Sequence, residues 1–241
     1  MTSIKTLTAL TLSACALAAC SSLSSEDLDT DGMHADITIE AHGDGRTQVR
    51  ASLRAGDAGS LTWVELDDGD RLFAQNGVER AQLSERNDAF EMYEYAAALD
   101  GDRPESPVRV ELRRAQFADA KDSQATLPAP FTVRTEVGGR ALVAGVDAVP
   151  LRWGQGSGDN VSVRISGDCL LDYDSGPMPD SGAVVLPPQA LEPWSSDAAG
   201  ESCVATVQVR RVRGGTLDPA FESGRITAAQ VRAVPLRVVI R

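Results

Sequence analysis

The acidic run Asp27-Leu28-Asp29-Thr30-Asp31-Gly32 carries residue types that bind a calcium ion. Carboxylates at alternate positions followed by a glycine are the pattern that opens a calcium-binding loop. Such a loop closes with a carboxylate at its twelfth position, and that position is Thr38. Clustered like charges and low hydrophobicity are typical of a disordered segment. Residues 20–32 are therefore predicted to be a disordered tether, with a calcium site at Asp27, Asp29 and Asp31 as the alternative.

Catalytic motifs are not found in the sequence. It has no Gly-x-Ser-x-Gly elbow, no His-Glu-x-x-His pair and no phosphate-binding loop. A Ser-His-Asp triad would have to use His34 or His42, and both lie at or beside an expected hairpin, where surface positions are predicted. The 35 acidic residues offer many carboxylate pairs for glycoside hydrolysis, but abundance alone does not indicate a site. We expect no enzymatic activity, no catalytic residue and no cofactor.

Residues 1–19 have the three parts of a secretory signal: a front end with Lys5, an apolar stretch from Leu7 to Ala19, and small residues before the cleavage point. The stretch is shorter than the roughly 20 apolar residues that span a bilayer. Its ending, Leu17-Ala18-Ala19-Cys20, resembles the bacterial lipoprotein box. This resemblance implies cleavage before Cys20, attachment of diacylglycerol to its thiol and, with Ser21 next, sorting to the outer membrane. An ordinary secretory signal with an incidental cysteine is the alternative.

Charge and length limit the partners and the number of domains. Without its leader the chain would have 222 residues, enough for one large or two ordinary domains, and a net charge of −13. An acidic body repels nucleic acid and anionic head groups. We therefore expect no nucleic-acid partner, and we expect membrane attachment through the lipid on Cys20.

Short alternating segments predict an all-β architecture. Apolar residues alternate with polar ones on both sides of the turn signal Asp44-Gly45, which predicts an antiparallel hairpin. Further strands are expected over 61–66, 71–75, 91–99 and 108–113, whereas residues 79–90 have an unclear pattern that a helix would also fit. Strands at this spacing, separated by Gly and Asp turns, predict a β-sandwich domain over residues 33–118.

A change of composition marks the expected domain boundary. Polar residues followed by Leu127-Pro128-Ala129-Pro130 predict a linker over residues 119–130. Residues 131–241 again alternate, for example at Val161, Val163 and Ile165, and predict a second β-sandwich. Pro235 shifts the apolar phase of the last strand, which predicts a bulge or an edge position there.

Cys169 and Cys203 both continue the apolar register of their strands. In an exported protein, two remaining cysteines at inward positions favour a disulfide. Two buried free thiols or a metal pair are the alternatives. A metal site needs more ligands, and the two histidines lie in the other predicted domain.

A longer set of residues supports export. It comprises 130–153, Ser166-Gly167-Asp168-Cys169, Cys203, and residues 210–221 with Leu217-Asp218-Pro219-Ala220-Phe221 ahead of Ile226-Thr227-Ala228. This set resembles a group of uncharacterised bacterial envelope lipoproteins with two immunoglobulin-like β-sandwich domains. The resemblance covers most of the second domain and, more loosely, the first. It implies export and a two-domain β architecture, and it implies no activity.

Together these features predict a lipid-anchored envelope protein that acts as a non-enzymatic binding or structural module. Its partner is expected to be an unidentified protein or glycan. Trp194, in a polar loop flanked by proline, is the candidate for ligand contact. The alternatives are a carboxylate-dependent hydrolase acting on envelope glycan and an accessory subunit of an envelope assembly.

Overall fold

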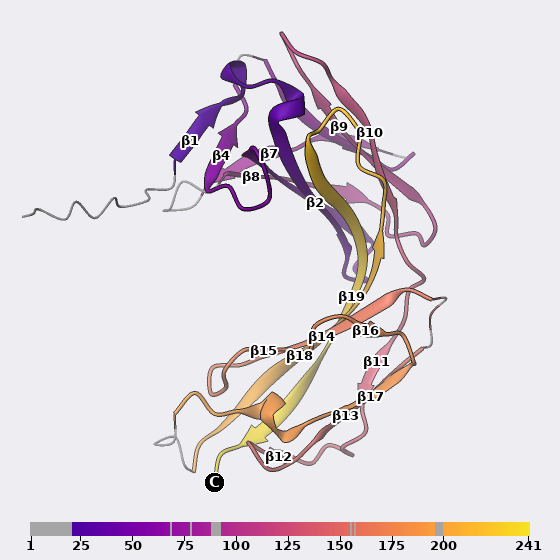
Figure 1. Ribbon diagram of the computed structural model, residues 1–241. Helices are drawn as coiled ribbons and strands as arrows, with labels where there is room; N and C mark the ends of the chain where they lie inside the picture. The colour runs from indigo at the N-terminus through magenta and orange to yellow at the C-terminus, as the bar shows by residue number, and fades with distance from the viewer. Residues whose placement is uncertain are drawn as a thin grey trace, which may run out of the picture.

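The computed structural model describes residues 21–67, 69–77, 79–87, 93–154, 156, 158–195 and 200–241; the predicted leader, residues 1–19, and Cys20 lie outside them. This part of the chain is all-β, as predicted, and has two hydrophobic cores (Figure 1). One long sheet passes through both cores, and a smaller sheet covers it at each. The helices among these residues are the short 3-10 turns η1 (Ser25–Asp27), η2 (Thr30–Gly32) and η3 (Pro188–Leu191). None of the described helices has the length and apolar character needed to cross a bilayer.

The first unit packs part of the long sheet against the four-stranded sheet β10-β9-β5-β6. The predicted hairpin around Asp44-Gly45 is confirmed, with Ile37 directly opposite Ala51 and both side chains buried. The long sheet contributes β2 (Met33–Ala41), β3 (Arg46–Ala55), β4 (Thr62–Glu65), β7 (Ser84–Asn87) and β8 (Tyr93–Asp100). The covering sheet consists of β5 (Arg71–Gln75), β6 (Arg80–Gln82), β9 (Pro107–Arg113) and β10 (Ala120–Thr126).

The second unit packs the other part of the long sheet against the three-stranded sheet β11-β13-β17. The predicted apolar row Val161, Val163 and Ile165 is buried on its inner face. The long sheet contributes β12 (Leu142–Val143), β14 (Asn160–Ser166), β15 (Tyr173–Asp174) and β16 (Met178–Pro179). The covering sheet consists of β11 (Val133–Thr135), β13 (Val149–Trp153) and β17 (Ala183–Leu186).

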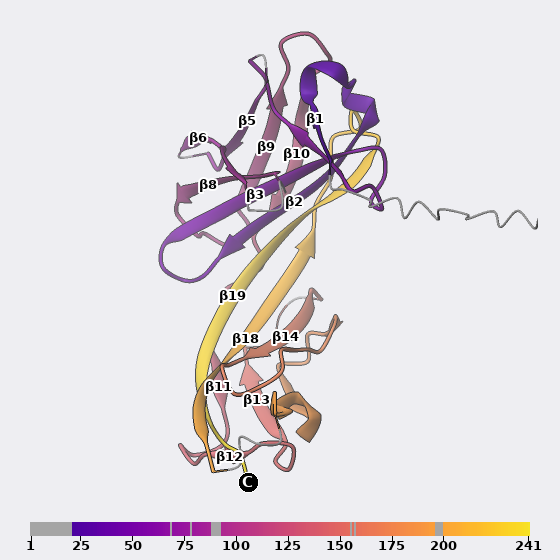
Figure 2. The same ribbon diagram turned by 90° about the vertical axis from the view of Figure 1, so that its left-hand side faces the viewer.

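A two-stranded ribbon of β18 (Ser202–Gly214) and β19 (Ser223–Val239) runs through both units (Figure 2). Its antiparallel register is continuous over 13 residue pairs. In the second unit β18 pairs with β14, and in the first unit the start of β19 pairs in parallel with β2. Phe221 and Ile226 therefore lie in the first core, although residues 131–241 are predicted to form the second domain.

Arg211 lies on β18 where the ribbon passes from one unit to the other, and its contacts stabilise this crossing. Its side chain is almost completely buried and donates to the carboxylate of Asp180 (2.7 Å) and to the carbonyl oxygens of Ala129 (2.7 Å) and Gly154. The guanidinium also lies over the Phe131 ring, 4.7 Å from its centroid. One buried cation thus ties the ribbon to the inter-unit connection and to two loops of the second unit.

The predicted linker over residues 119–130 is wrong for most of its length. Ala120–Thr126 forms β10, which pairs with β9 and buries Ala120 and Ala125. Polar residues occupy its outward positions, so composition alone suggests a linker. The connection between the cores is much shorter, because Leu127 packs in the first core and Phe131 in the second.

The described part of the predicted tether, Ser21–Gly32, is also ordered against the first unit. β1 (Ser21–Ser24) pairs in parallel with β4, and η1 and η2 follow. The buried guanidinium of Arg114 donates to the carbonyl oxygens of Ser25 (2.6 Å) and Leu28 (2.9 Å) and to Asp70 Oδ2 (2.6 Å). The prediction fails because this partner lies more than 80 residues away in the sequence.

Two local predictions are settled by strand pairing. Residues 79–90 form β6 and β7 as far as Asn87 rather than a helix, and residues 88–92 lie outside the described part of the chain.

Pro235 causes no bulge, because the β18–β19 register is unbroken there. It does occupy a local edge: β2 pairs with β19 up to Gln230 and β12 from Val238, so Pro235 has a partner strand on one side only among the described strands.

Loss of Arg114 should destabilise the first unit strongly, because Asp70 would remain buried without its cation. We expect Arg114→Ala to lower the free energy of unfolding by about 3–5 kcal/mol in urea denaturation. Arg109, which is exposed on the preceding strand β9, is the matched control, and Arg109→Ala should change stability by no more than about 0.5 kcal/mol. Equal effects of the two substitutions would contradict this assignment.

Candidate functional site at the disulfide-closed end of the second unit

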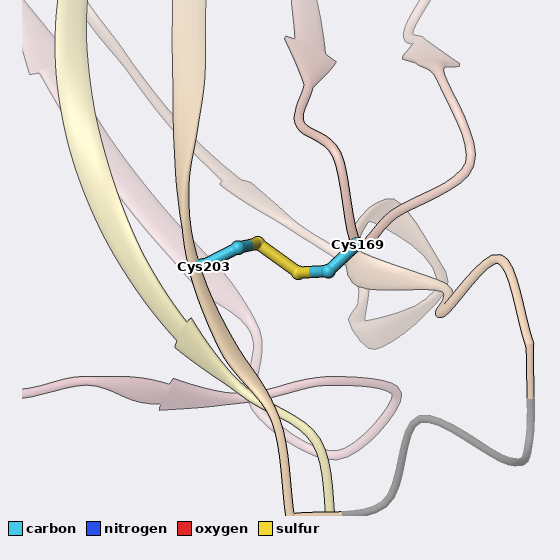
Figure 3. The surroundings of a disulfide bond; sticks show 2 residues. All are labelled: Cys169 and Cys203. Carbon is cyan, nitrogen blue, oxygen red and sulfur yellow. A yellow bond between two sulfur atoms is a disulfide. The ribbon is translucent and has the colours of Figure 1, made fainter.

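Cys169 and Cys203 form the predicted disulfide, with a Cα–Cα distance of 6.1 Å (Figure 3). The bridge joins the segment after β14 to the start of β18, and Cys169 is buried in the second core. Neither free thiols nor a metal pair is present at these positions. The bond fixes the segment that follows Cys169 against the end of the ribbon.

Main-chain hydrogen bonds tie a second segment to Cys169. Leu171 N–H donates to the Glu192 carbonyl oxygen (2.9 Å), and Trp194 N–H donates to the Cys169 carbonyl oxygen (3.3 Å). Between them, Leu170 and Pro193 form an isolated bridge. The preceding turn η3 buries Ala190 and Leu191 in the core. Both segments are therefore held by the disulfide, by the core and by each other.

Two large apolar side chains stand in solvent on these segments, and we call them the apolar pair. Trp194 is 59% exposed and Leu171 is 49% exposed. The predicted exposure of Trp194 is confirmed, while its contact with a ligand stays a prediction. Leu171 was not predicted, although the sequence Cys169-Leu170-Leu171 contains a signal: adjacent residues in extended chain point to opposite sides, and Leu170 points inward.

The apolar pair lies at the end of the ribbon remote from the first unit. Cys203 pairs with Val238 near one end of the ribbon, and Gly214 pairs with Thr227 at the other. Eleven residues of strand separate Cys203 from Gly214, which corresponds to roughly 36 Å. The second unit thus presents an ordered apolar surface far from the N-terminal segment along the ribbon.

The prediction that His34 lies at the surface is wrong, because this residue is only 6% exposed. Parallel pairing of β2 with β19 places it opposite Ser223, whose Oγ lies 2.8 Å from Nδ1. Its Nε2 lies 3.3 Å from Asp36 Oδ2. Serine, histidine and aspartate therefore meet, as they do in a nucleophilic triad. His42 is partly exposed, as predicted, and lies 3.5 Å from Glu40.

The surroundings of this cluster favour a structural role. Asp36 also accepts a hydrogen bond from Arg54, and its Oδ1 lies 3.1 Å from Arg225 Nε, so its charge is already matched by two guanidinium groups. Ser223 starts an ordinary strand rather than a sharp turn, and the preceding Glu222 N–H is used by the Met33 carbonyl oxygen (3.1 Å). With the Asp36 charge matched and the Glu222 N–H occupied, the contacts of the cluster fasten the start of β19 to β2.

Four carboxylates with buried side chains each lie beside an arginine. The side chains of Asp70, Glu111, Asp159 and Asp180 are buried, and each has an arginine within 3.3 Å. Hydrogen bonds from the Val143 N–H and the Arg140 guanidinium lower the pKa of Asp147. A glycosidase general acid requires the opposite shift. These five carboxylates therefore do not support the predicted alternative of a glycan hydrolase.

The calcium candidates do not converge. Asp27, Asp29 and Asp31 lie on η1, at the start of η2 and within η2, and all three are exposed. Within the described ranges there is no group of three or more His, Cys, Asp or Glu side chains suited to a metal ion. The run functions here as a docked segment with its acidic side chains in water.

Comparison with known proteins adds no family. No protein-family model and no curated protein matches the chain. Among solved structures it is similar to the FN1–FN3 domains of chicken CNTN1, at 10% identity and a TM-score of 0.25 over 85% of this chain and 66% of that one. It is also similar to Titin-A168169, at 9% identity and a TM-score of 0.25 over 87% of this chain and 98% of that one. The adhesin InvE of Yersinia pseudotuberculosis matches at 14% identity and a TM-score of 0.23, over 87% of this chain and 59% of that one. At these TM-scores the likeness carries no argument, and the all-β assignment rests on the strand pairing.

Removal of the disulfide should loosen the second unit. Because it closes a loop of 34 residues, the double variant Cys169→Ala/Cys203→Ala should lose about 3–4 kcal/mol of unfolding free energy. Urea denaturation followed by circular dichroism measures this loss. The wild-type protein under reducing conditions is the control and should match the variant. An unchanged midpoint in both would contradict the stabilising role of the bond.

Proposed function

We propose that this chain is a lipid-anchored protein of the bacterial envelope, held in the outer membrane, that binds a partner without catalysis through the apolar pair. The observation that carries the proposal is the exposure of Trp194 and Leu171 on segments that are otherwise ordered. The lipoprotein-like leader supports the location, and the disulfide agrees with an oxidising compartment.

The rigidity of the two segments supports binding. Large apolar side chains cost free energy in water, and a partner that covers them recovers it. Because the disulfide and main-chain hydrogen bonds already order the backbone, little further ordering is required on binding. Tryptophan is also enriched among the residues that dominate interface energies.

Charges around the apolar pair indicate which partner fits. Asp168, Asp172 and Glu192 are exposed on the same segments. Asp172 pairs with Arg164, while the surface as a whole belongs to an acidic chain. A protein surface with an apolar centre and a basic rim would complement this arrangement, whereas an anionic polymer would be repelled.

Site-specific photo-crosslinking in intact cells tests the binding surface. A photoreactive residue at position 194 should form adducts with a discrete partner, and Leu171→Ser should reduce them. Position 185 is the matched control, because Val185 is 68% exposed on β17 of the same unit. Adducts of equal yield at 185 and 194, or none at 194, would contradict the proposal. Trp194→Ala should itself change stability by no more than about 0.5 kcal/mol, because this side chain is exposed.

The anchor is tested independently by Cys20→Ser. Without the thiol, the protein should appear in the soluble fraction or remain as an uncleaved precursor. Fractionation of cells and immunoblotting measure both outcomes. Normal membrane retention of a cleaved variant would contradict lipid anchoring.

A further inference from the structure

A second candidate surface lies beside β1, where the described part of the chain begins. Ser21 is the first residue of β1 and pairs with Thr62 of β4. Cys20 is bonded directly to it, and adjacent Cα atoms are about 3.8 Å apart. Since Arg114 holds the residues after β1, no flexible spacer separates Ser21 from the first unit. Residues beside Thr62 therefore lie next to any group carried by Cys20.

Those neighbours have the character of a membrane-interface surface. Leu61 immediately precedes Thr62 and is 57% exposed. Trp63 pairs opposite Ser22 and is half-buried, with the Arg54 guanidinium 5.6 Å from its ring centroid. Tryptophan is favoured at the membrane–water interface, and an exposed leucine gains by leaving water.

The loop before Leu61 is ordered and carries little charge. Its sequence, Gly56-Asp57-Ala58-Gly59-Ser60, contains one ionisable side chain. Asp57 accepts from the Gly59 N–H (2.8 Å), and Arg54 donates to the Ala58 carbonyl oxygen (2.5 Å). Leu61 and Trp63 are thereby presented from a defined backbone rather than from a mobile loop.

The acidic residues of the N-terminal segment lie farther from the anchor point. Glu26 and Asp27 follow β1, and four residues of strand carry the chain roughly 13 Å. This exceeds the Debye length of about 8 Å at physiological ionic strength. Repulsion of anionic head groups by Glu26 and Asp27 is therefore weak at Leu61. Nearer to Trp63, Asp36 is paired with Arg54 and Arg225, and Glu65 accepts a hydrogen bond from Tyr93.

We propose that Leu61 and Trp63 dock on the lipid bilayer beside Cys20 and give the first unit a defined orientation on the membrane. The proposal rests on the lipid anchor of the proposed function. The acyl chains supply attachment, and the two side chains add contacts that resist rotation about the single covalent link. A first unit attached only through a flexible tether would have no preferred orientation on the membrane.

Quenching of tryptophan fluorescence by brominated lipid tests the docking. The purified, lipidated full chain is reconstituted in phosphatidylethanolamine–phosphatidylglycerol vesicles with or without brominated acyl chains. Part of the emission should be quenched in the brominated vesicles, and Trp63→Phe should remove that part. Quenching that persists in Trp63→Phe, or no quenching in the wild-type protein, would overturn the docking.

A second pair of variants tests the contribution of Leu61. Leu61→Ser should lower the quenched fraction at least about twofold, because its side chain no longer favours the bilayer. Leu171→Ser, a comparably exposed leucine of the second unit, should leave it unchanged. Equal effects would overturn the role of Leu61. Mass spectrometry of the N-terminal peptide separates the two proposals: an unmodified Cys20 overturns the anchor, whereas a lipidated Cys20 without quenching overturns only the docking.

Discussion

The β18–β19 ribbon is the constraint on which the rest of the structure depends. Its 13 consecutive pairs carry main-chain hydrogen bonds through both cores, so the units share strands instead of merely a linker. Arginines of β18 reinforce the crossing: Arg211 binds Asp180, and Arg213 binds Asp159 of the second unit and Glu105 of the first. The Asp159 and Glu105 carboxylates raise the pKa of Arg213 further, so this cation stays charged. Hinge motion between the units would have to break these bonds.

Features encoded by neighbouring residues were predictable from the sequence. The hairpin at Asp44-Gly45, the buried row of β14 and the cysteine registers all follow from a two-residue alternation. Features that depend on distant partners were not. The order of Ser21–Gly32 depends on Arg114, and the burial of His34 depends on parallel pairing with β19. The assignment of β10 to a linker failed because one of its faces is polar.

In the candidate site, too, features set by neighbouring residues were predictable and features set by distant partners were not. The exposure of Trp194 could be predicted, because its loop is polar and flanked by proline, but the identity of its neighbour could not. Leu171 is brought near it by main-chain hydrogen bonds from Leu171 to Glu192 and from Trp194 to Cys169, between segments that are well separated in the sequence and held by the disulfide. Apolar alternation identifies which of Leu170 and Leu171 faces outward only once the position of the core is known. Strand register thus indicates candidate surface residues, whereas tertiary contacts decide which of them form one surface.

Most arginines in the described chain are engaged in internal ion pairs, and this use of charge leaves an acidic exterior. Buried guanidinium groups at Arg114 and Arg211 neutralise carboxylates and satisfy carbonyl oxygens that loops would otherwise leave unpaired. Such pairs contribute specificity of arrangement, since desolvation offsets much of their attraction. Arg114 orders the N-terminal segment, and Arg211 orders the crossing between units. The same residue type therefore fixes where the chain enters the fold and how the remote apolar pair is positioned relative to that entry point, which a flexible tether and linker could not do.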